Sequence, residues 1–170
     1  MNKKVLNKQE IKNLITEKLP ILVDFDSTMV ITDKYPNIVG ENKPCVDVMK
    51  KWIDGGVGII LWTVRDGKEL DDAVEWCKKQ GLELYGVNVN PTQENWSNSR
   101  KIYGVLRVDD SNVGTKLIYD DKYRPRVDWE YIDKNYTKEI LECAAPYKNT
   151  ERVIFKHGKD DGNNVSQLFI

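Results

Sequence analysis

Two acidic residues stand two positions apart where an apolar run ends. Residues 21–23 are Ile, Leu and Val, and Asp24 and Asp26 follow at once. Side chains alternate between faces along a strand, so both carboxyl groups point the same way if the strand continues through them. Such a pair can bind one metal ion or act on one reacting group. Taken alone, the pattern equally fits a solvated strand end, because strands end in polar residues.

Two further apolar runs end in polar, oxygen-bearing residues. Residues 105–108 lead into the acid pair Asp109 and Asp110, and residues 58–62 lead into Thr63. In open parallel α/β sheets, ligands bind beyond the carboxyl ends of the strands. We therefore expect the three strand ends to converge on one site.

The segments between these runs show helical spacing. Apolar residues recur at helical intervals before the first run, between the first and second runs, and after the second run. Residues 84–87 form a further short apolar run, and Gly55, Gly56 and Gly81 mark helix ends. Strands that alternate with helices predict right-handed crossovers and a parallel sheet covered on both faces. The expected helices cover residues 7–19, 44–54, 70–80 and a stretch from about residue 127.

The composition is that of a globular protein with no strong charge bias. The chain has 170 residues, a formal net charge of -1, 40% hydrophobic and 31% charged residues. No apolar run approaches the roughly 20 residues of a membrane span, and no export signal is visible. A charge near zero argues against a general nucleic-acid footprint. Three widely separated cysteines and a single histidine do not suit structural zinc. An odd number of widely separated cysteines also indicates a reducing compartment, so we predict a cytoplasmic protein.

The order and spacing of these motifs resemble the haloacid dehalogenase (HAD) superfamily. That family's first motif, an apolar strand followed by D-x-D-x-T, reads here Asp24-Phe25-Asp26-Ser27-Thr28. Its second motif matches the run that ends at Thr63, and its fourth matches Asp109-Asp110. Its third motif is a lone Lys or Arg, for which Lys101 is the first choice and Arg100 the alternative. The resemblance spans about residues 20–135 and is strongest to the small microbial members without a cap domain.

The resemblance implies an α/β, Rossmann-like three-layer sandwich with a central parallel sheet. In the family's strand order, the Asp24 strand lies between the Thr63 strand and the Asp109 strand. A cap domain would be inserted after the first motif, but residues 30–43 are too short for one. We expect a loop or small hairpin there, and an open site with at most a flap. Residues 1–145 would form this domain, and residues 146–170 a C-terminal extension, either a β-hairpin, an oligomer contact or a loosely held end.

The resemblance also implies a magnesium-dependent phosphatase. Asp24 would attack a phosphoryl group to give an aspartyl-phosphate, and Asp26 would protonate the leaving oxygen and then activate water. Thr63 and the backbone amides after Asp26, in the Ser27-Thr28 segment, would hold the phosphoryl oxygens, and Lys101 would neutralise charge on Asp24 and the phosphoryl group. Magnesium would be bound by Asp24, the backbone carbonyl of Asp26, Asp109 and Asp110. The last two acids are adjacent rather than several residues apart, which leaves open which of them touches the metal.

Several residues keep two interpretations. Lys101 and Arg100 are equally well read as surface charges. Arg65 either touches a second anionic group of the substrate or pairs on the surface with Asp66 or Glu69. Asp120-Asp121 competes as the fourth motif, but it follows a weaker apolar run. Ser27 stands where many relatives of the superfamily have glycine.

Three functions remain open from sequence. The first is a phosphomonoesterase acting on a small phosphorylated metabolite. The second is a phosphatase for nucleotides or polynucleotide ends, which the aromatic and basic residues between Tyr119 and Tyr131 would serve. The simpler interpretation of that segment is a loop followed by a helix, with Trp129 and Ile132 packed inward. The third is a catalytically silent fold used for binding or assembly. The sequence predicts no oligomeric state.

Overall fold

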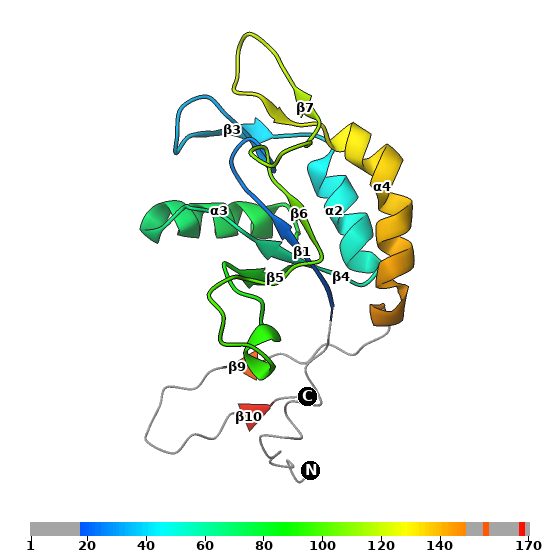
Figure 1. Cartoon of the computed structure of the whole chain (residues 1–170). Helices are drawn as coiled ribbons and strands as arrows, with labels where there is room; N and C mark the ends of the chain where they lie inside the picture. Colours follow the sequence, from blue (N-terminus) through cyan, green and yellow to red (C-terminus); the bar gives the residue numbers. More distant parts are fainter. Residues whose placement is uncertain (1–17, 149–154, 157–166, 169–170) are drawn as a thin grey trace. The chain divides into compact units, whose positions relative to one another are not determined.

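The computed structural model describes residues 18–148, 155–156 and 167–168. The chain divides into two units, Lys18–Lys148 and Met1–Glu17 with Asn149–Ile170. Among the described residues, the first unit holds the helices and the central sheet (Figure 1). The predicted boundary after residue 145 falls within a 3-10 turn, η2 (Ala145–Tyr147), just before the end of this unit. The helix predicted over residues 7–19 lies outside the described residues, except that Leu19 opens the first strand.

Four parallel strands form the central sheet in the order β5-β4-β1-β6. They are β1 (Leu19–Val23), β4 (Val57–Leu61), β5 (Leu84–Val87) and β6 (Leu106–Val108). Val23 lies opposite Leu61 on one side and Val108 on the other, so β1, β4 and β6 end level with one another. The Asp24 strand thus lies between the Thr63 and Asp109 strands, which confirms the expected order.

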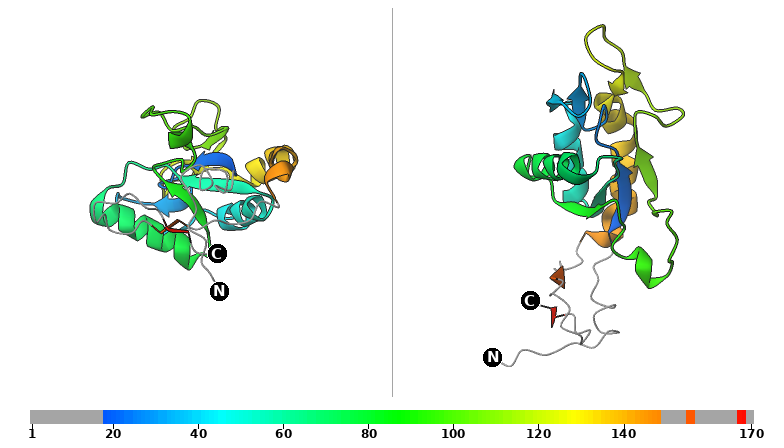
Figure 2. Two further views of the ribbon diagram at one scale, coloured as in Figure 1. Left: turned by 90° about the horizontal axis from the view of Figure 1, so that it is seen from below. Right: turned by 90° about the vertical axis from the view of Figure 1, so that its left-hand side faces the viewer.

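The helices α2 (Cys45–Asp54) and α3 (Gly67–Lys79) lie on one face of the sheet (Figure 2). Their crossovers move in the same direction across the sheet, and right-handed crossovers then place both helices on the same face. The other face is covered by residues 88–105, which include the short 3-10 helix η1 (Gln93–Asn95). Gly104 lies against this face, where a Cβ atom would meet Leu22 Cγ at 2.7 Å. The fold is an α/β, Rossmann-like three-layer arrangement, as predicted.

Helix α4 (Trp129–Ala144) packs beside α2. The rings of Trp52 and Trp129 lie 5.7 Å apart, and Trp52 Nε1 donates to Thr137 Oγ1 at 2.9 Å. Every residue of β1 and β4 is buried, as expected for parallel strands covered on both faces. Trp129 and Ile132 are buried, which confirms the prediction that they pack inward.

Two small hairpins flank the carboxyl ends of the central strands. The strands β2 (Val30–Thr32) and β3 (Ile38–Glu41) pair antiparallel and form a small flap, as predicted. The strands β7 (Leu117–Ile118) and β8 (Arg126–Val127) form a second hairpin that was not predicted. The helix expected from about residue 127 is confirmed and begins at Trp129, whereas the segment expected to be a loop forms this hairpin. Two-residue strands are too short to leave an alternating pattern in the sequence.

In the second unit, β9 (Phe155–Lys156) pairs antiparallel with β10 (Gln167–Leu168). These residues belong to the two short runs for which a β-hairpin was one of three interpretations, and the pairing agrees with that one where the structure describes it. In the described part of the chain, no helix combines the length and apolar character needed to cross a membrane.

Candidate active site

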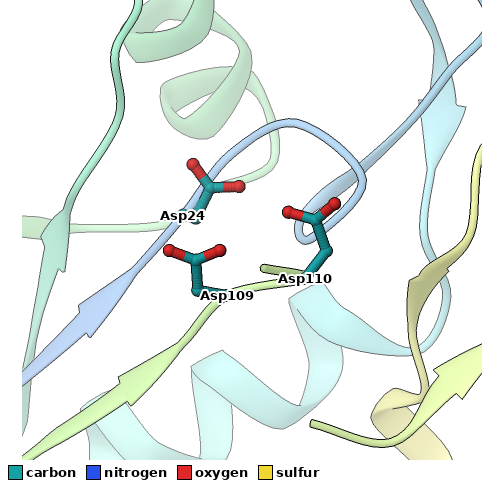
Figure 3. Close-up of side chains that lie close together, drawn as sticks. All are labelled: Asp24, Asp109 and Asp110. Atoms are coloured by element: carbon teal, nitrogen blue, oxygen red, sulfur yellow. The ribbon is translucent and has the colours of Figure 1, made fainter. Parts of the chain in front are cut away.

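Three carboxyl groups meet at the carboxyl ends of β1 and β6. Asp24, Asp109 and Asp110 each offer an oxygen that lies within 4.8 Å of the others (Figure 3). Asp24 follows β1, and its amide donates to the carbonyl of Val108, the last residue of β6, at 2.9 Å. The predicted convergence of these two strand ends is therefore confirmed. We call these three residues the acid triad.

The triad carries unfavourable charge at close range. Burial, together with the charges of Asp109 and Asp110, raises the pKa of Asp24 to about 7, although hydrogen bonds from the Phe25 amide and Thr28 act in the opposite direction. Burial and the neighbouring Asp109 also raise the pKa of Asp110. Three clustered carboxylates are the oxygen donors that a hard divalent cation binds, and such a cation would offset their repulsion. The donor set is therefore compatible with binding of a divalent cation.

The raised pKa of Asp24 predicts a pH-dependent stability of the metal-free protein. In the unfolded chain the pKa of an aspartate is about 3.9. Between about pH 4 and pH 7 the folded protein holds a proton that the unfolded chain has lost. The free energy of unfolding should thus fall as the pH rises through this window, by at most about 4 kcal/mol.

Thermal unfolding in the presence of a chelator tests this prediction. The unfolding midpoint of the native protein should fall relative to that of Asp24→Asn between pH 5 and pH 8, because the amide does not titrate. Parallel curves for the two proteins would show that Asp24 titrates normally.

The loop after Asp24 is fixed by buried hydrogen bonds. Ser27 adopts a left-handed conformation with φ of 58°, and its hydroxyl lies 3.1 Å from Thr32 Oγ1. The hydroxyl of Thr28 accepts from the Asp110 amide at 3.1 Å. Both side chains are buried. The two side chains thus hold the loop in place, and contact of the Ser27 and Thr28 backbone amides with a phosphoryl group stays a prediction.

Thr63 lies two residues after the end of β4. The Trp62 amide donates to the Val23 carbonyl at 2.9 Å, which continues the pairing of β4 with β1. The Thr63 hydroxyl accepts from the Arg65 amide at 3.2 Å. The structure thus brings Thr63 to the same edge of the sheet as the triad, as predicted. Its contact with a phosphoryl group stays a prediction.

Arg65 is buried and bound to Asp26. Its Nε donates to one carboxylate oxygen at 2.8 Å and its Nη2 to the other at 2.7 Å. The Arg65 side chain is 1% exposed and that of Asp26 is 15% exposed. Both earlier interpretations of Arg65, as a surface partner of Asp66 or Glu69 and as a substrate contact, are therefore wrong. Its guanidinium is occupied by the second acid of the first motif.

Lys101 and Arg100 lie away from the acid triad. The Val105 amide donates to the Pro20 carbonyl near the amino end of β1, and the Lys101 carbonyl accepts from Gln93 at 2.9 Å. Because β6 runs parallel to β1, residues that precede β6 lie at the opposite end of the sheet from Asp24. The prediction that one of them supplies the third motif is wrong.

A different cation lies near the triad. Arg124, in the loop of the β7–β8 hairpin, places Nη2 at 3.9 Å from Asp110 Oδ2. In the same hairpin, Asp120 of the loop pairs with Arg126 of β8. Asp120 therefore belongs to the hairpin, and Asp109-Asp110 is the acid pair that joins Asp24.

Comparison with solved structures gives one informative match. A conserved protein from Bacteroides thetaiotaomicron has 35% sequence identity and a TM-score of 0.59, and the match covers 72% of this chain and 93% of that chain. The chain belongs to the same family as this Bacteroides protein. No family profile and no curated protein matches this chain.

In this member of the family, two asparagines that sequence reasoning missed hold the site loops. Asn42 is buried, and its Nδ2 donates to the carbonyls of Thr28 at 2.9 Å and Val127 at 2.8 Å. Asn88 binds both the amide and the carbonyl of Thr63. A lone asparagine in a loop carries no periodic signal, so nothing in a single sequence distinguishes these two from the others.

Proposed function

We propose that the chain is a magnesium-dependent phosphohydrolase of the HAD type, acting on phosphate monoesters through an aspartyl-phosphate. The acid triad carries this proposal, because it places the first acid of the D-x-D-x-T motif beside the two acids that follow β6. The strand order, with β1 between β4 and β6, supports it.

The side chains at the site suit a two-step displacement. Magnesium, held by Asp24, the Asp26 carbonyl, Asp109 and Asp110, would offset the repulsion between the Asp24 carboxylate and an anionic phosphoryl group. An oxygen of Asp24 attacks phosphorus, and the bond from phosphorus to the ester oxygen breaks. The leaving oxygen takes the electron pair of that bond and a proton from Asp26.

The second step returns the enzyme to its starting state. Asp26 takes a proton from a water molecule, whose oxygen attacks phosphorus. The bond between phosphorus and the Asp24 oxygen breaks, phosphate leaves, and the Asp24 carboxylate is restored. Dividing the displacement into two steps replaces one difficult step by two easier ones.

Nucleotides form a second candidate substrate class. The β7–β8 loop brings Arg124 close to Asp110, and the same loop carries Lys122 and the 74% exposed Tyr119. An exposed aromatic ring beside cations can stack on a base while the cations contact phosphate. This arrangement favours a nucleotide over a small aliphatic ester.

Phosphate release from a substrate panel tests both candidates. The panel contains sugar phosphates, glycerol phosphate, nucleoside monophosphates and end-phosphorylated oligonucleotides, each assayed with magnesium and with a chelator. We expect magnesium-dependent release. If nucleotides are the substrates, Arg124→Met should raise KM for them and leave KM for glycerol phosphate unchanged. If no member of the panel releases phosphate, the proposed function is contradicted.

A further inference from the structure

The guanidinium of Arg65 joins three segments around the candidate site. It binds both carboxylate oxygens of Asp26, in the loop after β1. Its Nη2 also donates to the Pro36 carbonyl, in the flap, at 2.8 Å. Its Cζ lies 4.9 Å from the ring centre of Phe25 and 5.3 Å from that of Tyr35. Arg65 itself follows β4. Its side chain therefore connects the carboxyl end of β4, the loop after β1 and the flap.

This geometry fixes the orientation of the Asp26 carboxylate. Two parallel hydrogen bonds from one planar guanidinium set the plane of a carboxylate as well as its position. The two aromatic rings and the Pro36 carbonyl in turn fix the guanidinium. A surface ion pair would leave Asp26 free to rotate, whereas here the cation is almost completely buried.

We propose that Arg65 is a positioning residue that holds the Asp26 carboxyl in line with the leaving oxygen and couples this alignment to the flap. The inference rests on the proposed function, in which Asp26 binds a proton on an oxygen lone pair that the two Arg65 hydrogen bonds leave free, and transfers it to the leaving oxygen. Displacement of a reacting group by about 1 Å can cost on the order of 100-fold in rate. Arg65 therefore acts on the chemical step through Asp26 and touches no substrate.

Leaving-group dependence distinguishes this role from a purely structural one. An alkyl phosphate such as glycerol phosphate needs a proton on its leaving oxygen, whereas p-nitrophenyl phosphate has a leaving group that departs as a stable anion. Loss of Asp26 alignment should slow the first substrate much more than the second. General damage to the fold or to phosphate binding would slow both alike.

The experiment measures kcat and KM for both substrates in the native protein and in four variants. The variants are Arg65→Lys, Arg65→Met, Asp26→Asn and the double variant Arg65→Met with Asp26→Asn. Lysine keeps the positive charge but lacks the planar guanidinium with its parallel N–H groups, so it cannot reproduce the paired hydrogen bonds to Asp26. Arg107→Lys serves as the matched control, because Arg107 is an exposed residue of β6. The unfolding midpoint of each variant is measured alongside.

We expect Arg65→Lys to lower kcat for glycerol phosphate by about 10- to 100-fold, with KM changed less than about twofold. The loss with p-nitrophenyl phosphate should be several times smaller. Arg65→Met should add little to the loss in Asp26→Asn, since residues that act as one unit are not additive.

Three results would overturn the role. They are equal losses on both substrates, additive losses in the double variant, or a folded Arg65→Lys with native kcat. If Arg65→Lys does not fold, Arg65 is assigned to stability alone. A native protein inactive on both substrates contradicts the proposed function itself, and this outcome is distinct from the others.

Discussion

Replacing Asp24 by asparagine is expected to lower phosphate release by about a thousandfold or more, as loss of a nucleophile does in other enzymes. The amide lacks the charge that attacks phosphorus, and it is a poorer ligand for a divalent cation. Asp24 follows β1, which lies between β4 and β6, and it is the member of the triad that this strand end supplies. Initial rates at saturating magnesium, with the best substrate of the panel, measure the loss.

The fold of this variant should be intact. Asparagine replaces a buried carboxyl group whose pKa is raised to about 7 and which is therefore charged at pH 8. At that pH the unfolding midpoint of the metal-free variant should equal or exceed that of the native protein. Asp72→Asn is the matched control, since Asp72 is exposed on α3 and pairs only with Lys68 among the ion pairs described. A folded Asp24→Asn protein that retains native turnover would rule out Asp24 as the nucleophile.

Replacing Asp109 or Asp110 by asparagine is expected to reduce the stabilisation of the protein by magnesium. In the native protein, a cation bound only by the folded state raises the free energy of unfolding, by about 2.7 kcal/mol at a concentration 100 times Kd. Each variant should gain much less from the same magnesium concentration. Without metal, each should be more stable than the native protein at pH 8, because one of three clustered carboxylates is gone.

Thermal unfolding across a magnesium titration measures both effects together. The variant that loses more of the stabilisation identifies the acid that contacts the metal directly. Asp121→Asn is the matched control, because Asp121 belongs to the competing acid pair and is exposed outside the triad. Equal magnesium stabilisation in the native protein and both variants would show that the triad is not the metal site.

The parts of the site that follow strands could be predicted from the sequence. An apolar run that ends in acids marks both the strand and the edge where its acids emerge, and this placed Asp24, Asp109 and Thr63 correctly. Parallel strands that end level with one another then bring those residues together. The flap was also predictable, because residues 30–43 are too short for a domain.

The cations could not be placed in this way. Lys101 precedes its strand, so the rule that brings strand ends together puts it at the opposite edge. Arg65 follows Thr63 closely, yet nothing in its spacing shows that it turns inward to Asp26. Arg124 reaches the triad through a hairpin of two-residue strands. The position of a long charged side chain depends on tertiary contacts, which periodicity does not encode.

The most direct test of the central claim is to trap the phosphoryl group on the enzyme. The native protein is mixed with its best substrate and magnesium, quenched in acid during turnover and reduced with borohydride, which converts an aspartyl-phosphate to homoserine. Peptide mass spectrometry then locates the modified residue. The account predicts homoserine at position 24, and no conversion there in Asp24→Asn. Continued turnover with an unmodified Asp24, or modification at another carboxylate, would contradict it.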